Sequence, residues 1–228
     1  MKIVAVIPVK KISERVRKKN TRNFIGNNSL LDILVKKLLK IQQIDQIYIS
    51  SNDKKISKNY KNRKIKFLPR DEKYCNNIAS WSEVIFSVIN SVPVNLNTTI
   101  MWCHTTTPLF DSYAGAIKNY KKILKQRRFN GLVSVTRLSQ FIVTEKYQPL
   151  NYSWGAWHPY SQNLEKLYTI TGALFMATKN EMLKNRYVIS KKPYFYKTPS
   201  FQSIDIDTLY DFELAKLMYK NKKILKKL

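Results

Sequence analysis

The chain has 228 residues, 44% of them hydrophobic, which is enough for one sizeable buried core. Its 41 Lys and Arg residues outnumber its 15 Asp and Glu residues, and the net charge of +26 invites comparison with nucleic-acid-binding proteins. The cations are spread along the whole chain and accompany no nucleic-acid-binding motif, so we keep that class only as an alternative.

Membrane spans and cysteine-based sites are not expected. No apolar run approaches the roughly 20 residues that a membrane-spanning helix needs. Cys75 and Cys103 are too few and too isolated for a disulfide framework or a zinc site. Lys2 is followed directly by apolar residues with no small-residue cleavage site, so we expect no secretory signal and a cytoplasmic protein.

The first expected element is a strand over Ile3 to Ile7, which stops at Pro8. A continuous apolar run of this length is typical of a strand buried on both faces, in the middle of a parallel sheet. In open α/β sheets, ligands bind outside the carboxyl ends of such strands. The loop that follows is rich in cations, which predicts an anionic ligand, most naturally a polyphosphate. Its cations are Lys10, Lys11, Arg15, Arg17, Lys18 and Lys19.

The rest of the chain alternates between strand and helix patterns. Helices are expected over residues 30–39, from Asn52 onward, over 79–90, over 114–124, briefly after 177, and over 209–219. Strands are expected over residues 44–51, 65–68, 99–104, 132–135, 168–177, 194–196 and 203–207. This alternation with short connections predicts an α/β fold of three layers, with a mostly parallel central sheet and helices on both faces.

Residues 141–167 interrupt the alternation. The segment is polar and aromatic and contains the turn residues Pro149, Gly155 and Pro159. We interpret it as an excursion inserted into a single domain over residues 1–228, serving as an oligomer contact or a lid. Its aromatic rings could also stack on a ligand or pack in a core; they are Tyr147, Tyr152, Trp154, Trp157 and Tyr160.

Four blocks, taken in order, resemble the acylneuraminate cytidylyltransferase family, the CMP-sugar synthetases of sialic and related nine-carbon acids, with Kdo cytidylyltransferases as cousins. The family opens with Ile-Pro-Ala-Arg-Gly-Gly-Ser-Lys-Arg-Ile-Pro-x-Lys-Asn, and residues 7–20 are the equivalent here. Its Leu-Gln-Pro-Thr-Ser-Pro-Leu resembles residues 103–109, and its Asn-Gly-Ala-Ile-Tyr resembles residues 171–175. Its closing Ser-Ile-Asp-Ile-Asp-Thr is present unchanged at residues 203–208.

The chain departs from these motifs at several positions. The two glycines of the first motif are Lys11 and Ile12, so the backbone there cannot approach a phosphate in the same way. The motif arginine is Lys10, which lacks the bidentate guanidinium, and the motif lysine is Glu14. The glutamine of the second motif is His104. These changes leave the nucleotidyltransferase class intact and leave the choice of sugar and base open.

The resemblance implies a Rossmann-like nucleotidyltransferase fold and a homodimer. It implies transfer of CMP from CTP to an acidic sugar, such as the nonulosonic acid sialic acid, with release of pyrophosphate, in the synthesis of a surface polysaccharide or lipo-oligosaccharide. The alternatives are a nucleotidyltransferase of the same fold with another nucleotide or a Kdo-like acid, and a basic, non-catalytic nucleic-acid-binding protein.

The expected catalytic residues are Lys10, Arg15, Lys19 and Asp207. The three cations would bind phosphates, or would belong to a solvated basic loop. Asp205 and Asp207 lie two apart on an expected strand, so their carboxylates would share a face and suit Mg²⁺. Alternatively, the two acids only favour the start of the following helix.

The remaining site residues are assigned to the nucleotide or the sugar. Nucleotide contacts are expected from the three cations and from Ser13, Asn20, Ser80 and His104. Asn20 could instead brace the loop, Ser80 could be a helix N-cap with Glu83 completing a capping box, and His104 could be structural. Sugar contacts are expected from Thr106, Thr171 and Gly172, although a plain bulge explains the glycine nearly as well.

Overall fold

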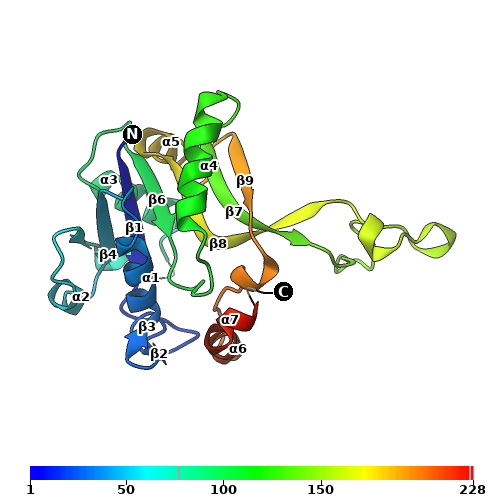
Figure 1. The fold of residues 1–228 in the computed structure, drawn as a ribbon, viewed down its shortest axis with the longest axis horizontal. Helices are drawn as coiled ribbons and strands as arrows, with labels where there is room; N and C mark the ends of the chain where they lie inside the picture. The colour runs from blue at the N-terminus through cyan, green and yellow to red at the C-terminus, as the bar shows by residue number, and fades with distance from the viewer. Residues whose placement is uncertain (77, 226, 228) are drawn as a thin grey trace.

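The computed structural model describes residues 1–76, 78–225 and 227 (Figure 1). Its centre is a seven-stranded sheet in the order β5-β4-β1-β6-β8-β7-β9. β8 runs antiparallel to its neighbours β6 and β7, and the other paired strands of this sheet are parallel. The strands are β1 (Ile3–Val9), β4 (Gln46–Ser51), β5 (Ile65–Pro69), β6 (Thr99–Cys103), β7 (Gly131–Leu138), β8 (Leu167–Thr178) and β9 (Pro193–Lys197).

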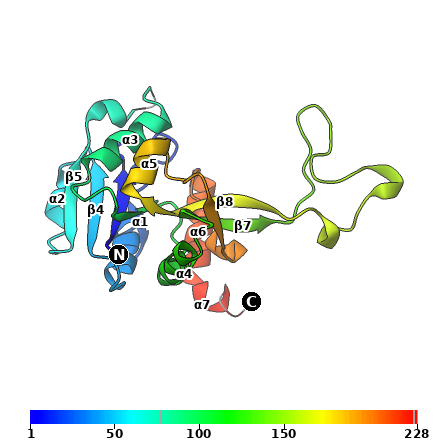
Figure 2. The ribbon, with the colours of Figure 1, turned by 90° about the horizontal axis from the view of Figure 1, so that it is seen from above.

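Helices cover both faces of this sheet, which confirms the predicted three-layer α/β fold (Figure 2). One face packs against α1 (Leu30–Leu39) and α4 (Tyr113–Lys125), with the short α2 (Lys55–Asn59) beside them. The other face packs against α3 (Trp81–Ser91) and α5 (Lys179–Asn185). The apolar run of β1 is divided between the two cores, because its side chains alternate in direction along the strand.

A third, smaller core joins the two ends of the chain. The hairpin of β2 (Asn23–Ile25) and β3 (Asn28–Ser29) packs against α6 (Leu209–Lys220), which the short α7 (Lys222–Leu225) follows. The Phe24 and Phe212 rings meet edge to face at 5.2 Å between centroids. This packing places the basic loop after β1 next to the segment that precedes α6.

The strand expected over residues 203–207 is wrong. After the 3-10 turn η4 (Ser200–Gln202), residues 203–207 have no regular secondary structure and belong to no strand. The Ile206 N–H donates to the Thr106 carbonyl at 2.9 Å, and the Ile206 side chain is fully buried. The segment is therefore anchored to a loop rather than to a sheet edge. The backbone hydrogen bond and the buried Ile206 side chain together hold Ile206 toward the core, with Asp205 and Asp207 on either side of it in the chain.

Residues 139–166 form an arm that projects away from the sheet (Figures 1 and 2). β7 and β8 pair as an antiparallel hairpin from Leu138 and Leu167 inward, and the arm is the connection between them. It contains the 3-10 turns η2 (Gly155–Trp157) and η3 (Ser161–Asn163). A further 3-10 turn, η1 (Glu72–Tyr74), lies outside the arm and follows β5. The Tyr147, Trp157 and Tyr160 side chains are exposed, so they do not pack in the core of this chain.

No helix in the described part of the chain is both long and apolar enough to cross a membrane.

Candidate functional site

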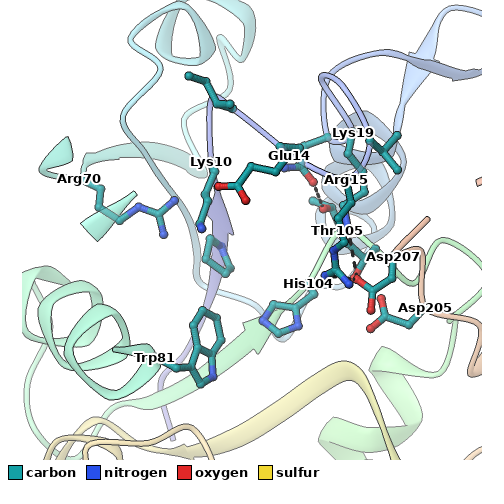
Figure 3. Close-up of a pocket in the computed structure, with 16 residues that line it drawn as sticks. Lys10, Glu14, Arg15, Lys19, Arg70, Trp81, His104, Thr105, Asp205 and Asp207 are labelled. Carbon is teal, nitrogen blue, oxygen red and sulfur yellow. Dashed lines mark hydrogen bonds and ion pairs between the residues drawn. The ribbon is translucent and has the colours of Figure 1, made fainter. Parts of the chain in front are cut away.

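A pocket of about 510 Å³ opens where β1 and β6 end (Figure 3). The chain runs outward from β1 through β4 to β5, then returns to place β6 on the other side of β1. The loops after β1 and β6 therefore diverge, and such a switch point is where open α/β sheets bind ligands. This is the position that the sequence predicted for an anionic ligand.

The basic loop supplies one wall of the pocket, including Lys10, Ser13, Arg15, Lys19 and Asn20. The Arg15 guanidinium donates to Asp207 Oδ1 at 2.7 Å, and both side chains are exposed, at 65% and 49%. Lys19 Nζ donates to the Ile206 carbonyl at 2.6 Å and lies 3.7 Å from Asp207 Oδ1. Two predicted phosphate ligands thus meet one of the predicted metal ligands.

The electrostatics of Lys19 reflect its burial. Desolvation lowers the pKa of its ammonium group, and the charges of Asp207 and Asp205 oppose that effect. Asn20, at the end of the same loop, is buried and accepts a 2.6 Å hydrogen bond from Thr105 Oγ1. Asn20 therefore braces the loop after β1 against the loop after β6.

Asp205 and Asp207 both line the pocket, on the side opposite Arg70 in Figure 3. Burial raises the pKa of the Asp205 carboxyl, and the neighbouring charge of Asp207 raises it further, although a hydrogen bond from Thr106 counteracts both. Two carboxylates held together in this way are stabilised by a cation. Among the described residues no group of three or more acidic, His or Cys side chains could hold a metal. The pair by itself nevertheless fits Mg²⁺, which proteins bind through one or two carboxylates together with substrate phosphates.

His104 forms part of the pocket floor, directly after β6. Its Nε2 accepts a 2.7 Å hydrogen bond from the Trp102 indole, and the ring makes a second hydrogen bond with the Gly172 backbone. Burial lowers the pKa of His104 to about 4, so the imidazole is neutral at physiological pH. Gly172 itself has φ +71°, and a Cβ there would lie 3.3 Å from Asp205 Oδ2. The glycine thus permits close packing with His104 and Asp205.

The family model described as "Cytidylyltransferase" matches residues 4–228. The chain belongs to the cytidylyltransferase family. This cytidylyltransferase is 25% identical to a pseudaminic acid cytidylyltransferase of Campylobacter jejuni over 96% of this chain and 97% of the relative. It is also 26% identical to an N-acylneuraminate cytidylyltransferase of Escherichia coli, over 94% of this chain and 51% of that longer relative. The enzyme class expected from the sequence, a nucleotidyltransferase, is confirmed.

Solved structures of similar fold support the same architecture. The 2-C-methyl-D-erythritol 4-phosphate cytidylyltransferase of Francisella tularensis superposes with a TM-score of 0.68, at 13% identity over 95% of this chain and 99% of that one. A CMP:2-keto-3-deoxy-manno-octonic acid synthetase complexed with CTP superposes with a TM-score of 0.64, at 11% identity over 97% of this chain and all of that one. Both confirm the nucleotidyltransferase fold.

The cytidylyltransferase pocket gathers most, but not all, of the predicted site residues. Ser80 does not line it: its hydroxyl accepts from the Glu83 N–H at 3.2 Å in a complete capping box, because it starts α3. Thr171 is also absent from the lining, since its buried hydroxyl lies 2.7 Å from Ser134 Oγ inside the sheet. Gly172 lies behind His104 and Asp205, whereas Thr106 lines the pocket directly.

Trp81 and Arg70 are among the pocket residues that the sequence did not single out as site residues. Trp81, near the start of the helix expected over residues 79–90, is 44% exposed and lines the pocket. Arg70, directly after β5, is buried, donates to the Val9 carbonyl at 2.6 Å, and has no hydrogen-bond partner for Nε in the described structure. Arg70 follows a predicted strand that ends at Pro69, and this position was the sequence signal for a site residue. The sequence does not indicate that the Arg70 side chain turns back toward β1, as Figure 3 shows.

Proposed function

We propose that this cytidylyltransferase transfers CMP from CTP to a hydroxyl of a nonulosonic acid, an acidic nine-carbon sugar, and releases pyrophosphate. The observation that carries the proposal is the meeting of Arg15 and Lys19 with Asp205 and Asp207 at the carboxyl ends of β1 and β6. The relatives named for pseudaminic acid and N-acylneuraminate support the choice of acceptor.

The reaction forms a bond between the sugar oxygen and the α-phosphorus and breaks the bond from that phosphorus to the oxygen that bridges to the β-phosphorus. Negative charge therefore grows on the leaving pyrophosphate and on the transferred phosphoryl oxygens. We assign Lys10, Arg15 and Lys19 to stabilise this charge, because cationic groups held in place before the reaction need little reorganisation. Lys19 is the most constrained of these, being anchored to the Ile206 carbonyl.

The far side of the pocket suits the nucleoside. Arg70 and Trp81 both line the pocket there, and the Arg70 side chain is held in place by its hydrogen bond to the Val9 carbonyl. We assign Arg70 to the acceptor atoms of the cytosine or the ribose, and the Trp81 ring to the adjoining apolar surface. With the nucleoside beside Arg70 and Trp81, the triphosphate would lie between these two residues and the Asp205–Asp207 pair.

We further propose that Asp205 and Asp207 hold Mg²⁺. When bound, the ion would neutralise the phosphate oxygens and help to orient the two substrates. Arg15 would then turn from Asp207 toward the phosphates, which its exposure permits at little cost. His104 takes no part in proton transfer in this scheme, because hydrogen bonds within the protein occupy both of its ring nitrogens.

The exposed arm suits a contact between two copies of the chain, so we propose a homodimer formed through residues 139–166. Tyr147, Trp157 and Tyr160 present apolar surface that one chain leaves uncovered. CTP is a cytoplasmic metabolite, so we place the reaction in the cytoplasm. A CMP-sugar is an activated donor, and its consumer would be a glycosyltransferase that builds a surface polysaccharide or lipo-oligosaccharide.

The test is pyrophosphate release with CTP, Mg²⁺ and each of pseudaminic acid, N-acetylneuraminic acid and Kdo. We expect release with at least one nonulosonic acid, dependent on Mg²⁺, and none when UTP, GTP or ATP replaces CTP. Release with another nucleotide would favour a different nucleotidyltransferase of the same fold, an alternative that His104 in place of the motif glutamine keeps open. No pyrophosphate release with any combination of nucleotide and acid, together with salt-sensitive binding of polynucleotides, would favour the nucleic-acid-binding alternative.

A further inference from the structure

Glu14 places a carboxylate in the basic loop that forms one wall of the pocket. It lines the pocket together with Lys10, Arg15 and Lys19, and its side chain is exposed. In Figure 3 the Glu14 carboxyl group is turned toward the side of the pocket where Lys10 lies, whereas the Arg15 guanidinium bonds to Asp207. These two neighbours in the chain thus point to different parts of the pocket.

The loop backbone is held on both sides of Glu14. After it, the Val16 side chain is buried in the small core that joins the two ends of the chain, and the Lys19 N–H donates to the Val16 carbonyl at 3.0 Å. Before it, the Lys11 N–H donates to Asn52 Oδ1 at 3.0 Å. The Glu14 side chain can rotate, but its backbone stays at the pocket wall, so a bound triphosphate must lie near this carboxylate.

The charge of Glu14 is unfavourable for a triphosphate alone. The family motif has a lysine at this position, so Glu14 replaces a positive charge with a negative one. Like charges several ångströms apart near a protein surface repel each other strongly enough to weaken an affinity by about tenfold or more. A divalent ion on the phosphates reverses this effect, because Mg²⁺ is commonly bound by one or two carboxylates together with substrate phosphates. Glu14 would therefore repel the free nucleotide and attract its magnesium complex.

We propose that Glu14 is a specificity-determining residue, which makes the pocket select CTP as its magnesium complex and reject the metal-free nucleotide. The proposal rests on the proposed function above, and it adds a contact for a divalent ion separate from Asp205 and Asp207. The simpler alternative is that Glu14 only offsets the surplus positive charge of the basic loop. In that case, its removal would strengthen the binding of both forms of the nucleotide by the same factor.

The experiment measures the Kd of CTP by calorimetric titration, in Mg²⁺ and in EDTA, for the wild type, Glu14→Gln and Glu14→Lys. Because all three proteins retain Asp205 and Asp207, differences between them isolate the effect of Glu14. We expect the ratio of the Kd in EDTA to the Kd in Mg²⁺ to fall by about tenfold in Glu14→Gln and about a hundredfold in Glu14→Lys, mainly through tighter binding of metal-free CTP. The control is Glu145→Lys, which makes the same charge change as Glu14→Lys on the exposed arm, outside the pocket lining, and should leave the ratio unchanged.

The outcomes separate the role of Glu14 from the proposed function. An equal gain in affinity for both forms of CTP in the Glu14 variants, or an unchanged ratio while CTP binding and pyrophosphate release persist, would overturn the role of Glu14 and leave the proposed function standing. Failure of the wild type to bind CTP even in Mg²⁺ would instead be a failure of the proposed function and would overturn both. Substitutions at exposed positions usually change stability little, so the melting temperature without ligand should show that all variants are folded.

Discussion

The exchange Asp207→Asn removes one carboxylate charge while keeping its shape, and we expect it to separate activity from stability. Asp207 is ion-paired to Arg15 at 2.7 Å, but the two side chains are 49% and 65% exposed. Exposed pairs of this kind contribute only about 0–1 kcal/mol to folding. For a domain of this size each kcal/mol corresponds to roughly 2–4 °C, so the melting temperature should fall by at most about 4 °C.

Activity should respond far more strongly than stability. Asp207 is a proposed Mg²⁺ ligand and the partner of two proposed phosphate ligands, Arg15 and Lys19. Loss of one electrostatic group positioned for a transition state costs about 10²–10³ in rate, and we expect a drop of that order in kcat/KM. The assays are pyrophosphate release at saturating Mg²⁺ and thermal unfolding with and without CTP.

A matched control is Asp111→Asn, since Asp111 also bonds two cations but lies outside the pocket lining. Lys222 and Lys37 approach it at 2.7 and 3.1 Å, and all three side chains are largely buried. Its loss leaves two ammonium groups side by side, so we expect about 1–3 kcal/mol of destabilisation with unchanged kcat/KM of the folded enzyme. Near-wild-type activity in Asp207→Asn, or the same activity loss in both variants, would refute our assignment of Asp207.

Three other expectations concern the scaffold around the site. Ser80→Ala should cost about 1 kcal/mol of stability through loss of the N-cap, without altering KM for CTP; a raised KM would restore Ser80 as a nucleotide contact. Lys179→Met should cost about 1–3 kcal/mol, measured by urea unfolding, because Lys179 Nζ donates to the Val92 and Asn90 carbonyls at the end of α3; an unchanged midpoint would contradict this. His104 has its pKa lowered from 6.5 to about 4, so the unfolded chain binds a proton that the folded chain does not within that pH window. Stability of the wild type should therefore fall more steeply from pH 6.5 to 4 than that of His104→Phe, and parallel unfolding profiles would refute the buried, neutral histidine.

Local patterns were sufficient for most of the helices and strands and for one wall of the pocket. The apolar run of β1 predicted a strand buried on both faces, and both cores of the sheet contain its residues. The loop after it predicted anion binding, and Lys10, Arg15 and Lys19 line the pocket. The burial of the strand and the charge of the loop could be predicted because both depend on residues that are adjacent in the chain.

The failures occurred where long-range packing decides the outcome. The alternation over residues 203–207 predicted a strand, but the Ile206 N–H donates to the Thr106 carbonyl in a loop and the segment lies outside the sheet. The helix α3 begins at the pocket edge, so Trp81 in its first turn is half-exposed and lines the pocket, which the periodicity of the helix does not indicate. Periodicity states which residues share a face, and says nothing about where that face ends.

The fold class, the basic loop and the aspartate pair could be predicted from the sequence, because they follow from the alternation of strand and helix patterns and from short motifs. Tertiary packing, in contrast, brings the loop near the N-terminus against the carboxylates near the C-terminus, and the contact of Phe24 with Phe212 is part of that packing. It also decided that His104 is neutral and has no free ring nitrogen, since its partners Trp102 and Gly172 come from two neighbouring antiparallel strands. Burial and hydrogen-bond saturation are properties of that assembled environment, and a residue's identity alone does not contain them.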